Sequence, residues 1–125
     1  MKTIVNTDKA PAAIGPYSQA IKGNGLMFIS GQLPVNPADN TIPATVEAQA
    51  KQSLENVVAI LAAEGLTTEA VVKTTVFLKN MNDFAAVNAI YAQYFTNDFP
   101  ARACVEVARL PKDALVEVEA IALYK

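Results

Sequence analysis

The residues best suited to chemistry gather near the C-terminal end of the chain. Arg102, Cys104 and Glu106 alternate along one predicted strand, and Glu117 and Glu119 alternate along the next. Residues two apart in a strand share a face, so each set points one way. A short connection predicts an antiparallel pair in which Cys104 faces Glu119, and a two-residue slip brings Glu117 there instead. Either register predicts a guanidinium and a carboxylate on one patch.

This patch has two interpretations. The pattern alone favours the simpler one, a solvated sheet face with ordinary ion pairs. The other is an anion site, because an arginine fork binds a carboxylate at two points and a nearby glutamate can hold a water and transfer protons. Cys104 is expected to pack as a small residue, since the chain has no histidine to activate it. Periodicity does not choose between Glu117 and Glu119.

Four more residues are candidates for a pocket. Gly31, beside Ser30 in a predicted strand, can admit a ligand close to the backbone. Tyr17 can belong to the core or offer its hydroxyl to a pocket. Asn88 lies beside the apolar stripe of a predicted helix. Each also has a structural interpretation, because serine, tyrosine and asparagine commonly serve packing or local hydrogen bonds.

Composition removes several classes of function. With 10 basic and 12 acidic residues the net charge is −2, which lacks the electrostatic footprint of a nucleic-acid-binding protein. One cysteine and no histidine cannot build the common zinc, copper or haem sites within one chain, so no metal is expected. No phosphate-binding, dinucleotide-binding, serine-hydrolase or dithiol motif occurs. Without a signal-peptide pattern or a membrane-length apolar run, the protein is expected to be cytoplasmic.

The elements that position these residues follow from periodicity and from breaks at glycine and proline. The sequence predicts a single domain, 1–125, of the α+β class, with a mixed six-stranded sheet and two helices on one face. Strands are predicted to end at Val5 and to span 17–22, 26–33, 71–79, 102–109 and 115–124. One helix is predicted between a Thr45 cap and Gly65, and a second between an Asn82 cap and Pro100. Since 52% of the residues are hydrophobic, the other sheet face is expected to contact other subunits.

Several motifs, in order along the whole chain, resemble the Rid (reactive intermediate deaminase) family, also called the YjgF family. They are APAAIGPYSQA at 10–20, FISGQLP at 28–34, QSLENV at 52–57, KTTVFL at 73–78, FPARACVEV at 99–107, LP at 110–111 and VEVE at 116–119. The resemblance implies a chorismate-mutase-like fold. It also implies a homotrimer with a central β-barrel and sites in the clefts between subunits.

The resemblance further implies an activity. Rid proteins hydrolyse reactive 2-imino acids, such as 2-iminobutanoate and 2-iminopropanoate, to 2-oxo acids and ammonia. The imines arise from the products of pyridoxal-phosphate enzymes, and the Rid protein itself needs no cofactor. Two other functions remain open: binding or sensing of 2-oxo acids without catalysis, and ribonuclease activity, against which the mild acidity and the lack of histidine argue.

The family motifs also imply roles for individual residues. Arg102 matches the arginine that binds the substrate carboxylate. Glu117 matches the glutamate associated with the attacking water, which ranks it above Glu119. The remaining matches line the family pocket, and they are Tyr17, Ser30, Gly31, Asn88 and Cys104.

Overall fold

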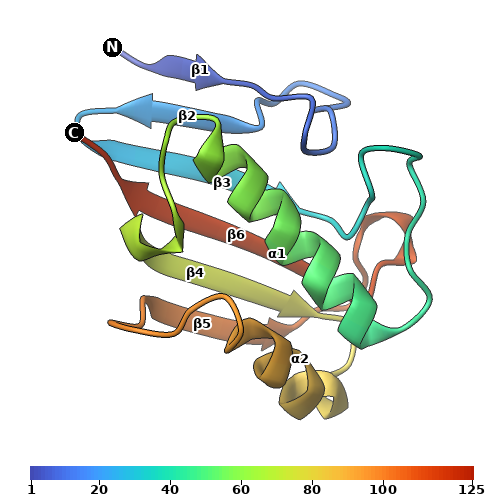
Figure 1. The fold of residues 1–125 in the computed structure, drawn as a ribbon. Helices are drawn as coiled ribbons and strands as arrows, with labels where there is room; N and C mark the ends of the chain where they lie inside the picture. Colours follow the sequence, from blue (N-terminus) through green and yellow to red (C-terminus); the bar gives the residue numbers. More distant parts are fainter.

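Six strands and two α-helices make up the computed structural model, which describes residues 1–125 (Figure 1). The strands are β1 (Thr3–Val5), β2 (Ala20–Gly23), β3 (Leu26–Gln32), β4 (Val71–Leu78), β5 (Ala101–Glu106) and β6 (Val116–Leu123). The helices are α1 (Val46–Ala62) and α2 (Phe84–Tyr91), and 3-10 turns span Thr68–Ala70, Met81–Asp83 and Pro111–Asp113. The predicted α+β class and the order of elements are confirmed.

The strands form one mixed sheet in the order β1-β2-β3-β6-β4-β5. Every neighbouring pair is antiparallel except β4 and β5, which are parallel. The predicted antiparallel pairing of the last two strands is wrong, because β4 lies between β5 and β6. The physical reason is the connection between them. It does not turn tightly but runs through a 3-10 turn in which Lys112 and Asp113 adopt positive φ, and so passes over β4 to the next position in the sheet.

One face of the sheet carries α1 and, at the β5 end, α2 (Figure 1). Alternate residues of β6 point into this layer, and Val116, Val118 and Ala120 are buried there. They pack with the apolar stripe of α1, which includes Leu54, Val57 and Leu61. Burial of this contiguous stripe is the main favourable term holding the helix on the sheet.

The caps of the two helices agree with prediction at α1 and differ at α2. Thr45 accepts a hydrogen bond from the Ala48 amide at 3.2 Å, as predicted for an N-cap. The predicted Asn82 cap is wrong. The side chain of Asn80 instead accepts from the Asn82 amide at 2.9 Å and caps the 3-10 turn that leads into α2. The second helix therefore begins at Phe84 and ends at Tyr91.

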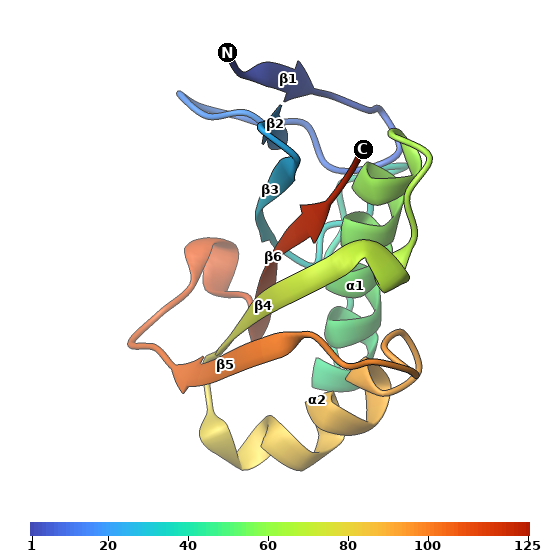
Figure 2. The same ribbon diagram turned by 90° about the vertical axis from the view of Figure 1, so that its left-hand side faces the viewer.

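The opposite face of the sheet carries no helix (Figure 2). Phe28 and Leu123 are exposed on this open face, as is Val105 on β5. An exposed apolar sheet face of this kind is typical of a surface that meets another chain. No helix has the length and apolar character needed to cross a membrane.

Candidate functional site

Arg102 lies on β5, and its side chain runs along one face of α2. Its Nη1 donates a hydrogen bond to Oδ1 of Asn88 at 2.6 Å. Its Cζ lies 4.7 Å from the ring centroid of Tyr91 and 5.6 Å from that of Phe84. Spacings of four and three residues put Phe84, Asn88 and Tyr91 on one helix face. We call these three residues with Arg102 the arginine cradle.

The guanidinium in this cradle remains available to a ligand. Arginine has five N–H donors, and the Asn88 oxygen occupies one. Arg102 is exposed although both its ring contacts and its hydrogen bond hold it against α2. A fixed, exposed guanidinium is suited to binding a carboxylate at two points.

Cys104 lies two residues further along β5, on the same face as Arg102. It is half-buried and packs against the core. Burial raises the pKa of the Cys104 thiol, although the positive charge of Arg102 acts in the opposite direction. The thiol is thus favoured over the thiolate, in agreement with the expectation that Cys104 contributes shape and not nucleophilic chemistry.

Glu117 lies on the open face of the sheet, opposite to Arg102. Arg102 is aligned with Thr74 of β4, which is fully buried beneath the helices. Glu117 alternates with the buried Val116 and Val118 and so faces the other way. With β4 also between their strands, the prediction that this guanidinium and this carboxylate share one patch of a single chain is wrong.

The Glu117 carboxyl occupies a niche formed by a β-bulge. The β3–β6 register passes from Ile29 opposite Ala120 to Gln32 opposite Val118, which leaves Ser30 and Gly31 opposite Glu119. A Cβ placed on Gly31 would lie 2.9 Å from the carboxyl carbon and from Oε2 of Glu117. Gly31 therefore leaves the room that this side chain fills. We call Ser30, Gly31, Glu117 and Glu119 the carboxylate niche.

The electrostatics of this niche favour a proton on Glu117. Burial raises the pKa of the Glu117 carboxyl, and the negative charge of Glu119 raises it further. Both causes penalise the charged form, because a half-buried carboxylate has less water around it and a like charge nearby. The shift moves the group toward the range in which a carboxylate works as a general base near neutral pH.

Ser30 connects the niche to the segment that carries Tyr17. Its Oγ donates to the Ser18 carbonyl at 2.6 Å, and its amide donates to the Gln19 carbonyl at 2.9 Å. The Tyr17 ring is exposed and lies against Gly15, whose φ of 132° is accessible to glycine. The predicted pocket residues thus divide into two groups within one chain. Asn88, Arg102 and Cys104 gather at α2, and Ser30, Gly31 and Glu117 gather at the bulge, with the Tyr17 segment bonded to Ser30.

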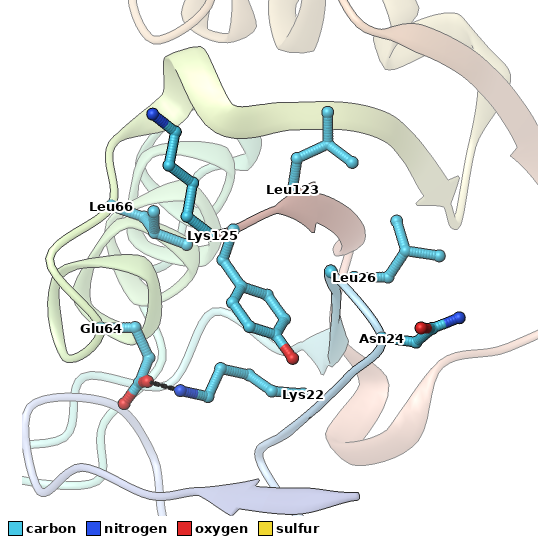
Figure 3. Close-up of a pocket in the computed structure, with 9 residues that line it drawn as sticks. Lys22, Asn24, Leu26, Glu64, Leu66, Leu123 and Lys125 are labelled. Atoms are coloured by element: carbon cyan, nitrogen blue, oxygen red, sulfur yellow. Dashed lines mark ion pairs between the residues drawn. The ribbon is translucent and has the colours of Figure 1, made fainter. Parts of the chain in front are cut away.

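A cavity of about 830 Å³ lies elsewhere in the fold, at the end of the sheet where β6 finishes (Figure 3). Its lining combines an apolar floor with the ion pair of Lys22 and Glu64, and Lys22 lies 5.1 Å from the Tyr124 ring centroid. The lining residues are Lys22, Asn24, Gly25, Leu26, Glu64, Leu66, Leu123, Tyr124 and Lys125. None of them is a predicted site residue.

Two residues of the cradle were assigned to the apolar stripe of a helix by their spacing alone. Phe84 and Tyr91 do lie on that stripe, and the structure adds that their rings face a guanidinium. The signal in the sequence was the position of Asn88 between them, at four and three residues. An amide between two aromatic residues on one helix face is compatible with binding a cation from a neighbouring strand.

Comparison with known proteins identifies the family. Residues 7–124 match the family model described as Endoribonuclease L-PSP. A protein of Escherichia coli (strain K12) named 2-iminobutanoate/2-iminopropanoate deaminase is 56% identical over 128 residues, covering all of both chains. The crystal structure of the E. coli YjgF gene product has a TM-score of 0.95 at 54% identity, covering 98% of this chain and 99% of its own. That of E. coli TdcF with bound serine has a TM-score of 0.95 at 48% identity, with the same coverage.

These matches cover nearly every residue, including both the cradle and the niche. The family model alone spans residues 7–124, and the fold agrees with solved members throughout. The resemblance indicated by the motifs is confirmed, and the chain belongs to the Endoribonuclease L-PSP family, the YjgF/Rid family.

Proposed function

We propose that this protein hydrolyses 2-imino acids, such as 2-iminobutanoate and 2-iminopropanoate, to 2-oxo acids and ammonia. The observation that carries the proposal is the exposed Arg102 guanidinium, fixed by α2 with donors free for a carboxylate. The full-length relative at 56% identity, which is named for this activity, supports the same substrate class. The solved relative TdcF holds serine, which also has an α-carboxylate.

The working form is a homotrimer with a central β-barrel, in which each site lies between two chains. Arg102 and Glu117 point to opposite faces of one sheet, so one site takes Arg102 from one copy and Glu117 from the next. The exposed apolar residues of the open face, among them Phe28 and Leu123, supply surface for this contact. A head-to-tail contact that closes on itself gives a ring with equivalent sites.

Substrate binding begins at the cradle. Arg102 binds the carboxylate in a charge-assisted pair, while Asn88 and Cys104 shape the surrounding wall. The neighbouring copy contributes Tyr17, Ser30 and Gly31 to the other wall. The imine carbon then lies next to the niche that contains Glu117. Fixing the carboxylate and the water on two rigid walls lowers the entropic part of the barrier.

The chemistry is addition of water followed by loss of ammonia. Glu117 accepts a proton as the water oxygen bonds to the imine carbon, and the C=N π electrons move to the protonated nitrogen. The same carboxyl then returns its proton to that nitrogen. The C–N bond breaks, ammonia leaves with the bonding pair, and the hydroxyl loses a proton as the carbonyl forms. The raised pKa of Glu117 suits a group that must both accept and return a proton.

The test is a coupled assay with matched arginine variants. A dehydratase generates 2-iminobutanoate, and semicarbazide traps whatever the protein does not hydrolyse. The wild type should suppress trapping, and Arg102→Ala should not. Arg109→Ala, which removes the only other arginine of the chain from an exposed connection, should behave as the wild type. Full activity in a folded Arg102→Ala protein would refute the assignment.

The printed description of the family names an endoribonuclease, so RNA cleavage is measured on the same samples. With a net charge of −2 and no histidine, the chain is expected to show no cleavage that depends on its site. Saturable binding of 2-oxobutanoate without turnover of several imines would instead make the protein a binding module.

A further inference from the structure

The Tyr91 side chain is fixed on several sides at the end of α2. Its hydroxyl lies 2.7 Å from Oγ1 of Thr74, and both residues are buried. Its ring stacks on that of Phe95, with centroids 4.5 Å apart. An aromatic ring held by a stacked neighbour and a buried hydrogen bond has one orientation available to it. Tyr91 is therefore a rigid surface.

Arg102 lies on that surface. Its Cζ is 4.7 Å from the Tyr91 centroid, closer than its 5.6 Å to the Phe84 centroid. Thr74 is also the register partner of Arg102 in the parallel β4–β5 pair. The same residue thus aligns the arginine backbone through the sheet and anchors the tyrosine ring through its hydroxyl. Thr74, Tyr91 and Arg102 form a closed triangle of contacts.

We propose that Tyr91, anchored by Thr74, is a positioning residue that holds the Arg102 guanidinium ready for the substrate carboxylate. The inference rests on the proposed function, since the carboxylate is that of the 2-imino acid. A free arginine side chain loses rotamer freedom when it binds an anion, and a preformed contact with a fixed ring removes part of that cost. Tyr91 acts through Arg102 and touches no reacting atom.

The state of the phenol supports this role. Burial raises the pKa of the Tyr91 hydroxyl, against the lowering effects of the Thr74 hydrogen bond and the Arg102 charge. The phenol therefore stays protonated at working pH, and its bond to Thr74 persists. A neutral tyrosine presents the negative face of its ring quadrupole to the cation without becoming an ion-pair partner that would compete with the substrate.

The test separates the ring from the hydroxyl. Tyr91→Leu removes the ring face, Tyr91→Phe keeps it, and Thr74→Val removes only the anchor. Tyr94→Leu is the matched control, because Tyr94 follows α2, is also half-buried, and bonds Glu55 instead of contacting Arg102. Each variant is assayed for KM and kcat with 2-iminobutanoate and for the Kd of 2-oxobutanoate.

The expected result is a change in affinity with little change in turnover. Tyr91→Leu should raise KM and Kd by about 3- to 30-fold, the range of a cation–π contact, while kcat stays within about twofold. Tyr91→Phe should recover most of that loss, and Thr74→Val should raise Kd about 2- to 5-fold through the looser ring. Equal effects of Tyr94→Leu and Tyr91→Leu on Kd would overturn the proposal, because they would indicate general loss of packing.

A spectroscopic readout makes the inference independent of activity. The chain has two arginines, so a nitrogen–proton correlation spectrum shows two Nε–Hε resonances, and Arg102→Lys identifies one of them. The Arg102 proton should be shifted by the Tyr91 ring current, move toward the Arg109 position in Tyr91→Leu, and stay in Tyr91→Phe. Thr74→Val should move it even where Tyr91→Leu does not fold.

An Arg102 resonance that ignores both Tyr91→Leu and Thr74→Val would overturn the positioning role. So would a resonance that moves while the Kd of 2-oxobutanoate does not. Absence of imine hydrolysis in the wild type, with the resonance and the Kd responding as expected, would refute the proposed function and leave the positioning of Arg102 in place.

Discussion

Gly31 determines where the Glu117 carboxyl can lie. A Cβ at Gly31 would come within 2.9 Å of the carboxyl carbon and Oε2, a distance that side chains do not tolerate. Only the mobile end of Glu117 obstructs the new atom, so it can swing away at little cost in stability. The position of the proposed base would be lost while the fold remains.

We therefore expect Gly31→Ala to lower kcat for 2-iminobutanoate by about 10- to 100-fold, the effect of an ångström-scale misplacement. The melting temperature should change little. Gly23→Ala is the matched control, since a Cβ there meets its nearest atom, the Met1 carbonyl oxygen, at an ordinary 3.6 Å. Steady-state kinetics and thermal unfolding of both variants test the expectation, and an unchanged kcat in Gly31→Ala would refute it.

Glu119 influences Glu117 through charge. Its carboxylate adds to burial in raising the pKa of the Glu117 carboxyl, so the basic form of Glu117 is lost at a higher pH than usual as the solution is acidified. Glu119→Gln removes the like charge and leaves the burial. The acid limb of the kcat/KM profile should therefore move to lower pH and remain above that of an ordinary glutamate.

The pH profiles of wild type and Glu119→Gln measure this shift. Glu69→Gln, a charge change at an exposed residue of a 3-10 turn, should leave the limb in place. A limb that stays put or moves upward in Glu119→Gln would show that another group sets it.

At the scale of elements, the sequence predicted what each segment is better than where it goes. Alternation in Val116–Ala120 and the 3-4 spacing in α1 report which side of an element is buried, and both were confirmed. Strand order depends on pairings that no single strand encodes. The connection after β5 looked like a hairpin loop, yet it passes over β4, and this error also put Arg102 and Glu117 on one face.

The residues of the site were predictable for the same reason and to the same extent. Their types and spacing, with the family motifs, identified Arg102, Glu117 and Gly31, but the distances between them come from tertiary structure. The bulge that opposes Ser30 and Gly31 to one residue of β6 leaves no periodic signal, because it interrupts the alternation that such reasoning uses.

One buried amide ties the N-terminal loop to β2. The Gln19 side chain accepts from the Thr7 amide at 2.7 Å and donates to the carbonyls of Thr7 at 2.9 Å and Pro11 at 2.8 Å. The residue is 2% exposed. Gln19→Leu leaves these backbone groups unsatisfied, so we expect the free energy of unfolding to fall by about 2 to 3 kcal/mol.

Urea unfolding at one fixed protein concentration measures this loss, because the stability of an oligomer depends on concentration. Gln93→Leu, a change at an exposed glutamine after α2, should stay within about 0.5 kcal/mol of the wild type. Since Gln19 also holds the backbone that bonds Ser30, imine hydrolysis should fall in Gln19→Leu even under conditions where it is fully folded. A loss of stability no greater than in Gln93→Leu would contradict the role of this amide.

At the scale of the whole molecule, the arrangement of faces predicts complementation between inactive chains. Arg102→Ala keeps Glu117, and Glu117→Gln keeps Arg102. In a closed ring of three chains that contains both variants, one interface joins an intact arginine to an intact glutamate. Random mixing in equal amounts should therefore restore about one quarter of the wild-type activity.

The measurement is imine hydrolysis after the two variants are unfolded together and refolded. Each variant refolded alone should stay near its own residual rate. A mixture of Arg102→Ala with the Arg102→Ala/Glu117→Gln double variant should gain nothing, because no chain in it carries Arg102. Both controls separate complementation from recovery by refolding. A site built within one chain could not be restored by mixing, so failure of folded, mixed trimers to regain activity would refute the shared site, whereas recovery in the first mixture alone would assign Arg102 and Glu117 to different copies.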